Sequence, residues 1–474
     1  MKRFFVGLVE ILISVSILCS CHQNVESRVE EVQQDEEKQE EKPVLVFSIG
    51  NSSILSDFQT ENTDQNIEIV VIDQSNVEKD FEDSIYEKGM PDIIIDSGNE
   101  RGLDFWLEKG YCEDISTYVD TDTSFDSDKY YPGVMSVGQV DNQVVALPLG
   151  LSIDYLTVRE EIYDNSGLHY LEENYSAEEL LSTLDQELDY QNRIFNEGNG
   201  ELIYQVFSDW NGDFVFLLWD YGALSVPNDE ITLDKELFNL ICRVYEKHCW
   251  NFSYANQQGT APMNTKTSPL DKGARYIATT WFNSGINKGV APQVAISYAE
   301  SINKEVFGQE TKVIWMPMKS ETNEEPEYAA RVSFWGMVGS QSERKEEAYQ
   351  ILRDMMDLEL SAYSRVDGQQ EIPFSVNREK SLAMITMVDE SSIKSYTISD
   401  EEGESSTITK HSLSLENRAQ LEYVLENITN IYTVDMDLQD QIFDIVYPYV
   451  QGGVGHYDEC YDLVLELLQK EMIE

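Results

Sequence analysis

The sequence predicts an α/β protein with a mostly parallel, buried sheet. Three near-continuous apolar segments, each running into a polar or glycine-containing turn, predict its first strands: 43–53 (PVLVFSIGNSS), 67–73 (IEIVVID) and 91–99 (PDIIIDSGN). Helical patterns such as 77–88 separate them. Alternation of helices with apolar strands is typical of a parallel sheet that helices cover on both faces. Ligands of such sheets bind beyond the carboxyl ends of the strands, so the turns after the first and third strands are candidate binding loops.

Composition limits the classes of function that need attention. The chain has 474 residues, enough for two to three domains or one bilobal unit, and its 41% hydrophobic and 11% aromatic content supports a large core. With 33 basic and 88 acidic residues its net charge is −55, so its surface repels nucleic acid and anionic lipid head groups. Six scattered cysteines without a C-x-x-C pair, and five histidines, predict neither a disulfide framework nor a metal site, and we expect no cofactor.

The N-terminus has the proportions of a secretory signal, which we place at residues 1–20. Lys2 and Arg3 precede an apolar run that ends in Leu18-Cys19-Ser20-Cys21, and this ending resembles the bacterial lipobox, with Cys21 as the lipidated residue. Glu10 interrupts the run, which is also short for a membrane span, so a membrane anchor helix is the weaker alternative. Residues 21–42 are acidic and lack aromatic side chains, which predicts a disordered tether.

Later segments continue the α/β pattern. We expect a strand at 311–320, an amphipathic helix at 343–365 with Ser342 as its N-cap, and an exposed acidic loop at 395–410. Two final helices have apolar faces at helical spacing, and Gly452 and Gly453 separate them.

The order of these motifs resembles the extracellular solute-binding proteins of ABC importers, in the family that mainly binds sugars. The resemblance rests on MPDIIIDSGNERGLDFWLEKGYCEDIS (90–116), KYYPGVMSVGQVDNQVVALPLGLSIDYLTVREEIYD (129–164), KGARYIATTWFNSG (272–285), and VSFWGMVGSQSERKEEAYQILRDMM (332–356) followed by IPFSVNREKS (372–381). It covers the chain from residue 43 to the end, and the final helical pair resembles that of Gram-positive members. The tryptophan that these proteins often carry after the first strand is missing.

The resemblance implies a periplasmic-binding-protein-like fold of two α/β lobes, each a mostly parallel sheet flanked by helices, with a helical C-terminal extension. Lobe one would comprise residues 43–150 and 311–335, and lobe two residues 151–310 and 336–474. The crossing segments that serve as hinges would lie near 148–153, 314–317 and 336–340.

A sugar needs aromatic platforms for its C–H faces and polar groups for its hydroxyls. The candidate platforms at predicted strand ends or crossings are Tyr155, Trp219, Tyr221, Trp281 and Trp335. The candidate hydrogen-bonding residues are Asn51, Asp96, Ser97, Asn99, Ser152 and Asp154. The alternative for each aromatic is core packing, and for Asp96 and Asp154 it is helix capping or a solvated turn. The remaining tryptophans, Trp315 among them, are expected to be packing residues.

We therefore expect a monomeric, lipid-anchored binding protein on the extracytoplasmic face of a Gram-positive cell membrane. It would capture a small solute and deliver it to ABC permease subunits, and we expect this solute to be a carbohydrate. One alternative is a surface lipoprotein that acts as a sensor co-receptor or protein-binding module. Another is a glycoside hydrolase, which needs two carboxylates flanking a sugar, and a chain with 88 acidic residues always offers pairs such as Asp209 and Asp213. No G-x-S-x-G or P-loop motif is present, and we do not expect an enzyme.

Overall fold

The computed structural model describes residues 42–471 apart from 51–53, 56–57, 60–61, 64, 74–75, 97–101, 172–173, 197–212, 226–230, 259–291, 320–324, 359–373, 387–394, 400–404, 410–412, 434–435 and 453–455. The predicted signal peptide, Cys21 and nearly all of the tether lie outside the described residues and stay predictions. Pro43–Glu474 form one compact unit, separate from Met1–Lys42. Within the described residues, no helix combines the length and the apolar character that crossing a membrane requires.

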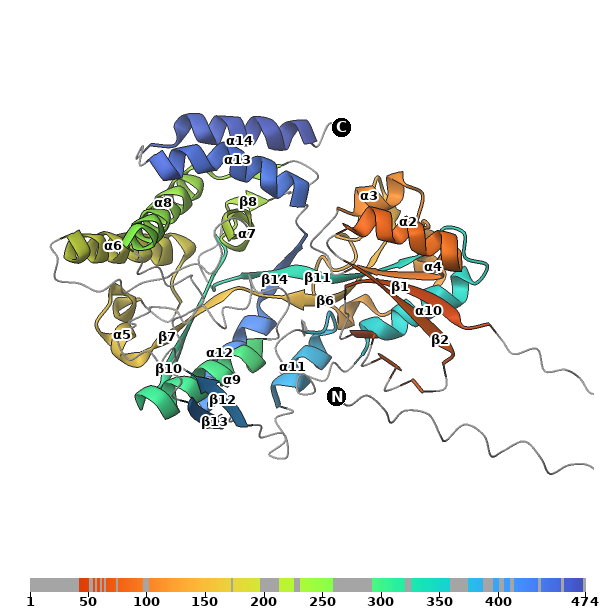
Figure 1. The fold of residues 1–474 in the computed structure, drawn as a ribbon, viewed down its shortest axis with the longest axis horizontal. Helices are drawn as coiled ribbons and strands as arrows, with labels where there is room; N and C mark the ends of the chain where they lie inside the picture. The colour runs from red at the N-terminus through yellow and green to blue at the C-terminus, as the bar shows by residue number, and fades with distance from the viewer. Residues whose placement is uncertain are drawn as a thin grey trace, which may run out of the picture. The chain divides into compact units, whose positions relative to one another are not determined.

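The main sheet has six strands, in the order β14-β11-β3-β1-β2, with β6 on the other edge of β11 (Figure 1). Its strands are β1 (Val44–Ile49), β2 (Ile67–Ile72), β3 (Ile93–Asp96), β6 (Leu147–Ser152), β11 (Tyr328–Val338) and β14 (Ile428–Tyr432). β1 pairs in parallel with β2 and β3, as the three apolar segments predict. β11 runs antiparallel to β3 and β6 and parallel to β14, so the sheet is mixed rather than parallel throughout.

Strand β11 explains the mixed sheet. All eleven of its residues are buried. Its first half pairs with β14, and its second half pairs with β3, where Trp335 lies opposite Asp96. On its other edge β6 pairs with it from Arg331 to Gly336, with register shifts between Val332 and Trp335. β11 thus links β14 to β3 and β6, and its antiparallel pairing with the last two makes the sheet mixed.

The smaller sheets are antiparallel pairs. They are β4 (Gln139–Val140) with β5 (Gln143–Val144), β7 (Tyr155–Arg159) with β10 (Thr311–Trp315), β8 (Leu224–Ser225) with β9 (Thr232–Leu233), and β12 (Ser395–Ser399) with β13 (Ser405–Thr409). β7 follows β6 after only two residues, so the chain passes directly from the main sheet to the β7–β10 pair. The resemblance implies a mostly parallel sheet in each lobe, whereas the described strands outside the main sheet form antiparallel pairs.

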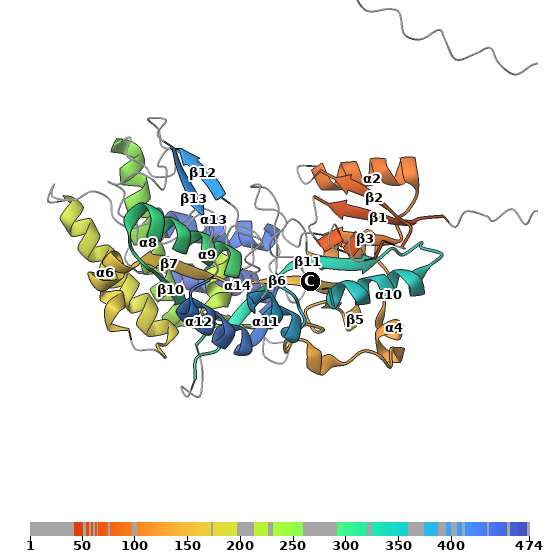
Figure 2. The same cartoon turned by 90° about the horizontal axis from the view of Figure 1, so that it is seen from below.

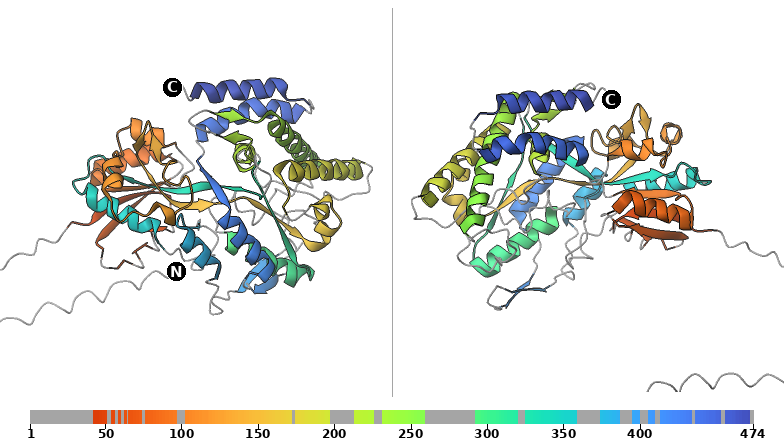
Figure 3. Two further views of the ribbon diagram at one scale, coloured as in Figure 1. Left: turned by 180° about the vertical axis from the view of Figure 1, so that it is seen from behind. Right: turned by 45° about the horizontal axis from the view of Figure 1, so that its top comes forward.

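Helices flank both groups of strands. They are α2 (Val77–Lys88), α3 (Leu103–Glu108), α4 (Ser116–Thr121), α5 (Glu160–Asp164), α6 (Ala177–Asn196), α7 (Asp213–Asp220), α8 (Lys235–Gln258), α9 (Pro292–Ile302), α10 (Lys345–Met356), α11 (Arg378–Thr386), α12 (Leu415–Glu426), α13 (Met436–Gly452) and α14 (Asp458–Glu471), with short turns η2 (Ser127–Lys129), η3 (Gly167–Tyr170) and η6 (Asn303–Phe307). Helix α2 packs against β2, and helix α10 packs against β6 and β11 (Figure 2). Helix α8 packs against α6, α7, α13 and α14 (Figure 3).

Two hydrophobic cores result, as a two-lobed α/β fold requires. The first contains the buried side chains of β1, β3, β6 and β11 together with those of α10. The second contains those of α6, α7, α8, α13 and α14, and Leu156, Val158 and Ile314 from the β7–β10 pair. The predicted faces of the last two helices are confirmed, because Ile442, Val446 and the buried residues of α14 belong to the second core. The predicted lobe boundaries stay predictions.

Two local expectations are wrong. Helix α10 begins at Lys345, and Arg344 stands at the N-cap position without a side-chain cap. The Ser342 hydroxyl instead accepts a hydrogen bond from the Arg344 N–H and donates one to Asp92 Oδ1, at 3.0 and 2.6 Å. The expected acidic loop contains the β12–β13 hairpin, because its Thr and Ile residues are β-branched and favour strands on either side of the acidic segment.

Candidate functional site

A cluster of buried polar side chains lies where the chain passes between the two cores. Ser152 ends β6, Asp154 lies between β6 and β7, and Asp220 ends α7. Arg331 of β11 is in register with Ser152 on one side and with Tyr432 of β14 on the other. All five side chains are at most 5% exposed. Four segments distant in sequence therefore bring two carboxyl groups, a guanidinium, a phenol and a hydroxyl together.

Hydrogen bonding leaves part of this cluster open. The Tyr432 hydroxyl donates to Asp220 Oδ1 at 2.7 Å. Among the described residues, no group donates to Asp220 Oδ2, Asp154 Oδ2 or the Ser152 hydroxyl oxygen. A buried acceptor without a donor costs about 1–3 kcal/mol. A proton on Asp220 reduces that cost, because Asp154 is within hydrogen-bonding reach of it.

Electrostatics favour that proton. Burial, and after it the negative charge of Asp154, raise the pKa of Asp220 well above its ordinary value. The hydrogen bond from Tyr432 and the positive charge of Arg331 act in the opposite direction without cancelling the shift. Burial likewise raises the pKa of Tyr432. These effects favour the protonated form of Asp220, in which the carboxyl group can donate a hydrogen bond.

An aromatic platform adjoins the polar cluster. The Trp219 ring stacks on the Tyr432 ring with centroids 5.4 Å apart and an interplanar angle of 8°. Trp219 is half-buried, and Met318 and Ala329 complete this small apolar group. One face of the indole is thus covered by Tyr432, whose hydroxyl is anchored on Asp220, the next residue in the chain. Such a ring, fixed on one face and partly accessible, suits the C–H face of a sugar.

Other predicted site residues lie elsewhere. Asp96 ends β3 and accepts a hydrogen bond from the Trp106 indole nitrogen at 2.8 Å. Trp335 and Tyr221 are 1% and 0% exposed, in the first and second cores, and neither offers a ring face to a ligand in this structure. Tyr155 is buried against Trp315, with centroids 5.2 Å apart. The predicted residues outside the described ones are Asn51, Ser97, Asn99 and Trp281.

The structure therefore brings Ser152, Asp154 and Trp219 to one place and adds three residues that the sequence reasoning missed. A signal for two of them was present. Arg331 is the one charged residue in the eleven-residue apolar strand YAARVSFWGMV, and Asp220 interrupts the apolar run FVFLLWDYGAL. A lone charge in an otherwise buried segment indicates a partner or a function. Tyr432 carried no comparable signal.

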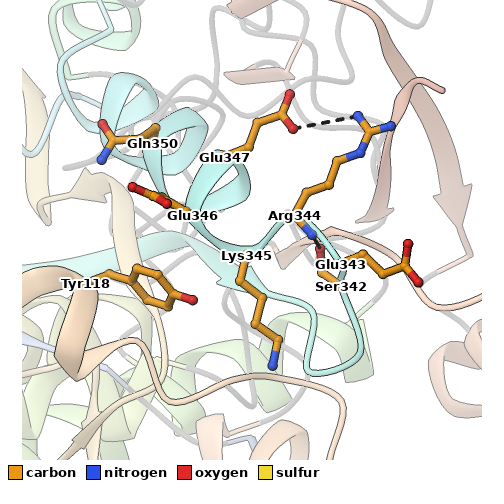
Figure 4. A pocket seen from close by; sticks show the side chains of 8 residues that line it. All are labelled: Tyr118, Ser342, Glu343, Arg344, Lys345, Glu346, Glu347 and Gln350. Carbon is orange, nitrogen blue, oxygen red and sulfur yellow. Dashed lines mark hydrogen bonds and ion pairs between the residues drawn. The ribbon is translucent and has the colours of Figure 1, made fainter. Parts of the chain in front are cut away.

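A hollow of about 660 Å³ lies elsewhere, at the start of α10 (Figure 4). Its lining is mostly charged: Tyr118, Ser342, Glu343, Arg344, Lys345, Glu346, Glu347 and Gln350. Arg344 and Glu347 form an ion pair at 3.7 Å. The hollow contains one aromatic side chain and none of the predicted site residues, and we assign no ligand to it.

Comparison with known proteins identifies the fold as that of the two-lobed, sugar-type solute-binding proteins of ABC importers. Similar solved structures include the sugar-binding protein MalE from Xanthomonas citri, with a TM-score of 0.55 at 14% identity over 91% of this chain and 98% of that chain. A cyclic α-maltosyl-1,6-maltose binding protein from Arthrobacter globiformis has a TM-score of 0.54 at 13% identity, covering 91% and 98% of the two chains.

A third similar structure is an ABC substrate-binding protein from Listeria monocytogenes in complex with cycloalternan. Its TM-score is 0.52 at 13% identity, and the match covers 91% of this chain and 99% of that one. No family model matches the sequence, and no curated protein matches it either. The likeness therefore extends over nearly the whole of these proteins and concerns the fold.

Proposed function

We propose that this protein is the lipid-anchored substrate-binding component of an ABC importer and that it captures a carbohydrate. The observation that carries the proposal is the half-buried Trp219 ring, stacked on Tyr432 beside the buried polar cluster where the chain passes between the two cores. Similar structures whose names state a bound sugar, such as cycloalternan, support the ligand class.

In this proposal the ligand lies against the exposed part of the Trp219 side chain. Its hydroxyl groups, which both donate and accept hydrogen bonds, suit a cluster that offers a protonated carboxyl and acceptor oxygens lacking donors among the described residues. Ser152 of β6 and Arg331 of β11 belong to the polar cluster, and small rotations at the register shifts between these strands would open and close the site. Closure by the ligand would present the protein to its permease, and the ligand is not chemically changed.

A thermal-shift screen of mono- and oligosaccharides tests the ligand class. A carbohydrate at 100 times its dissociation constant stabilises the native state by about 2.7 kcal/mol and raises the melting midpoint. Trp219→Ala should lose this shift. Tyr170→Ala, which removes an aromatic ring that is 84% exposed, is the matched control and should keep it. If no carbohydrate stabilises the protein, or if one is hydrolysed during incubation, the proposal fails.

The anchor requires a separate test. Intact mass spectrometry of the mature protein from its native host should find Cys21 as the first residue, carrying a diacylglyceryl group. Cys21→Ser should move the protein from the membrane fraction to the medium. An unmodified Cys21 in membrane-bound protein would contradict the lipid anchor and leave the ligand proposal untouched.

A further inference from the structure

A second pocket, of about 530 Å³, lies along the outer edge of β10, between that strand and helix α12. This volume is within the range of small-molecule sites, about 300–1,000 Å³. Five of the lining side chains are aromatic: Tyr163, Tyr175, Trp315, Tyr328 and Tyr423. Apart from the Lys312–Glu416 ion pair, at 2.8 Å, the lining side chains are uncharged.

The backbone of β10 faces this pocket with alternate residues. The Glu160 N–H donates to the Glu310 oxygen at 3.0 Å, so even-numbered residues of this segment direct their backbone groups toward β7. Odd-numbered residues therefore direct theirs away from β7. Two carbonyl groups on that side confirm the alternation: the Thr311 oxygen accepts a bond from Asn417 Nδ2 at 3.0 Å, and the Trp315 oxygen accepts one from the Tyr175 hydroxyl at 2.7 Å.

Between these two occupied carbonyls lies Val313. Its N–H and C=O point to the same side, and among the described residues no group on that side bonds to either of them. Side chains of the pocket add further unused capacity. The Trp315 indole nitrogen and Gln420 Oε1 are both inaccessible to solvent and have no partner among the described residues. The pocket thus combines the backbone N–H and C=O of Val313 with aromatic walls, and two further polar atoms without a described partner belong to its lining residues.

We propose that this pocket binds a short extended peptide, one residue of which exchanges two hydrogen bonds with Val313. An extended residue offers an N–H and a C=O on the same side, which is the complement of Val313 in an antiparallel pair. Asn417 and Tyr175 occupy the neighbouring carbonyls, so the open edge accommodates one paired residue and not a long strand. The ligand is therefore about three residues long and apolar, and it binds independently of the sugar proposed above.

The test uses acetyl-Ala-Val-Ala-amide as the probe and the full chain labelled with ¹⁵N-valine. The peptide should shift the Val313 amide resonance. The same peptide with an N-methyl group on its central valine keeps its shape and loses the donor, and it should bind at least tenfold more weakly by calorimetry.

Two variants of α12 provide matched controls. Ala419 lines the pocket, and Ala419→Trp should fill it and weaken peptide binding at least tenfold. Leu415 lies on the same helix, is 83% exposed and does not line the pocket, so Leu415→Trp should bind the peptide as the wild type does. Val313→Pro removes the outward N–H without removing a bond to β7 and should weaken binding about three- to tenfold.

The proposal is overturned if the peptide leaves the Val313 resonance unchanged, or if the N-methylated peptide binds equally well. It is also overturned if both tryptophan variants behave alike, or if maltose shifts Val313 in place of the peptide. A free Ala-Val-Ala tripeptide separates two sources of the ligand. Binding equal to that of the blocked peptide indicates a peptide solute, and loss of binding indicates an internal segment of a protein chain.

Discussion

The hydrogen bond from Tyr432 to Asp220 supports a quantitative prediction. Tyr432→Phe removes one hydroxyl and keeps the ring that stacks on Trp219. Asp220 Oδ2 has no donor among the described residues, so the variant leaves both oxygens of a buried carboxyl group without one. The cost of an unsatisfied buried acceptor is about 1–3 kcal/mol, and we expect the free energy of unfolding to fall by about 2 kcal/mol.

Tyr423→Phe is the matched control. The Tyr423 hydroxyl donates to Glu325 Oε2 at 2.7 Å, the same length as the Tyr432 bond, but at an exposed position. Water replaces that partner, so the control should lose less than about 0.5 kcal/mol. Both variants would be unfolded in urea at neutral pH, and their midpoints compared at a common m-value. Equal losses of unfolding free energy in the two variants would refute the argument that burial makes the Tyr432–Asp220 hydrogen bond the more costly one to remove.

Further predictions follow from the same structure. Asp220→Asn should gain stability relative to the wild type as pH rises. The pKa of Asp220 is raised in the folded state, so the stability that its protonated form contributes to the wild type is complete below about pH 4. That contribution is lost as pH rises toward the folded-state pKa, at about 1.4 kcal/mol per pH unit. Urea unfolding of both proteins from pH 4 to 8 measures the difference, and a constant difference in unfolding free energy would contradict the prediction. Gly339→Ala should lower the free energy of unfolding by about 1–3 kcal/mol, because a Cβ there would clash with the Pro91 carbonyl oxygen. In the control Gly89→Ala the new Cβ meets no atom within 4 Å, so only the positive φ of Gly89 carries a cost. Equal losses of stability in thermal unfolding of the two variants would count against the packing argument. Cys112, whose pKa burial raises to about 12, and the buried Cys242 should react with Ellman's reagent at pH 8 only after unfolding, and rapid labelling of the native protein would be incompatible with their burial.

The sequence was informative where a local pattern determines structure. Continuous apolar runs identified β1, β2 and β3, and helical spacing gave α2 its observed bounds, Val77–Lys88. These elements are determined by residues close together in the chain. The relative directions of the strands in the main sheet are not determined locally. Strand β11 pairs with β3 and β6, which precede it by more than 170 positions, and with β14, which follows it. No periodicity within a strand reports which way its partner runs.

The same limit applies to the candidate site. Ser152, Asp154 and Trp219 could be named because each stands at the end of an apolar segment. Whether an aromatic residue packs or binds depends on what covers its second face, and only the fold places Tyr432 on one side of Trp219. Tyr221 lies two positions after Trp219 in the chain, but it is fully buried in the second core, whereas Trp219 is only half-buried.

Burial of the polar cluster bears on its purpose. Replacing a buried group of charges by apolar residues of similar volume is often neutral or stabilising, so stability alone does not explain Arg331 beside two carboxyl groups. A helix end, a crossing strand and the last residue of β14 converge on these side chains, which fixes their positions before any ligand arrives. Pre-positioned polar groups lower the cost of ordering on binding. We therefore propose that the cluster serves to hold Trp219 and a polar ligand in one orientation more than to strengthen the fold.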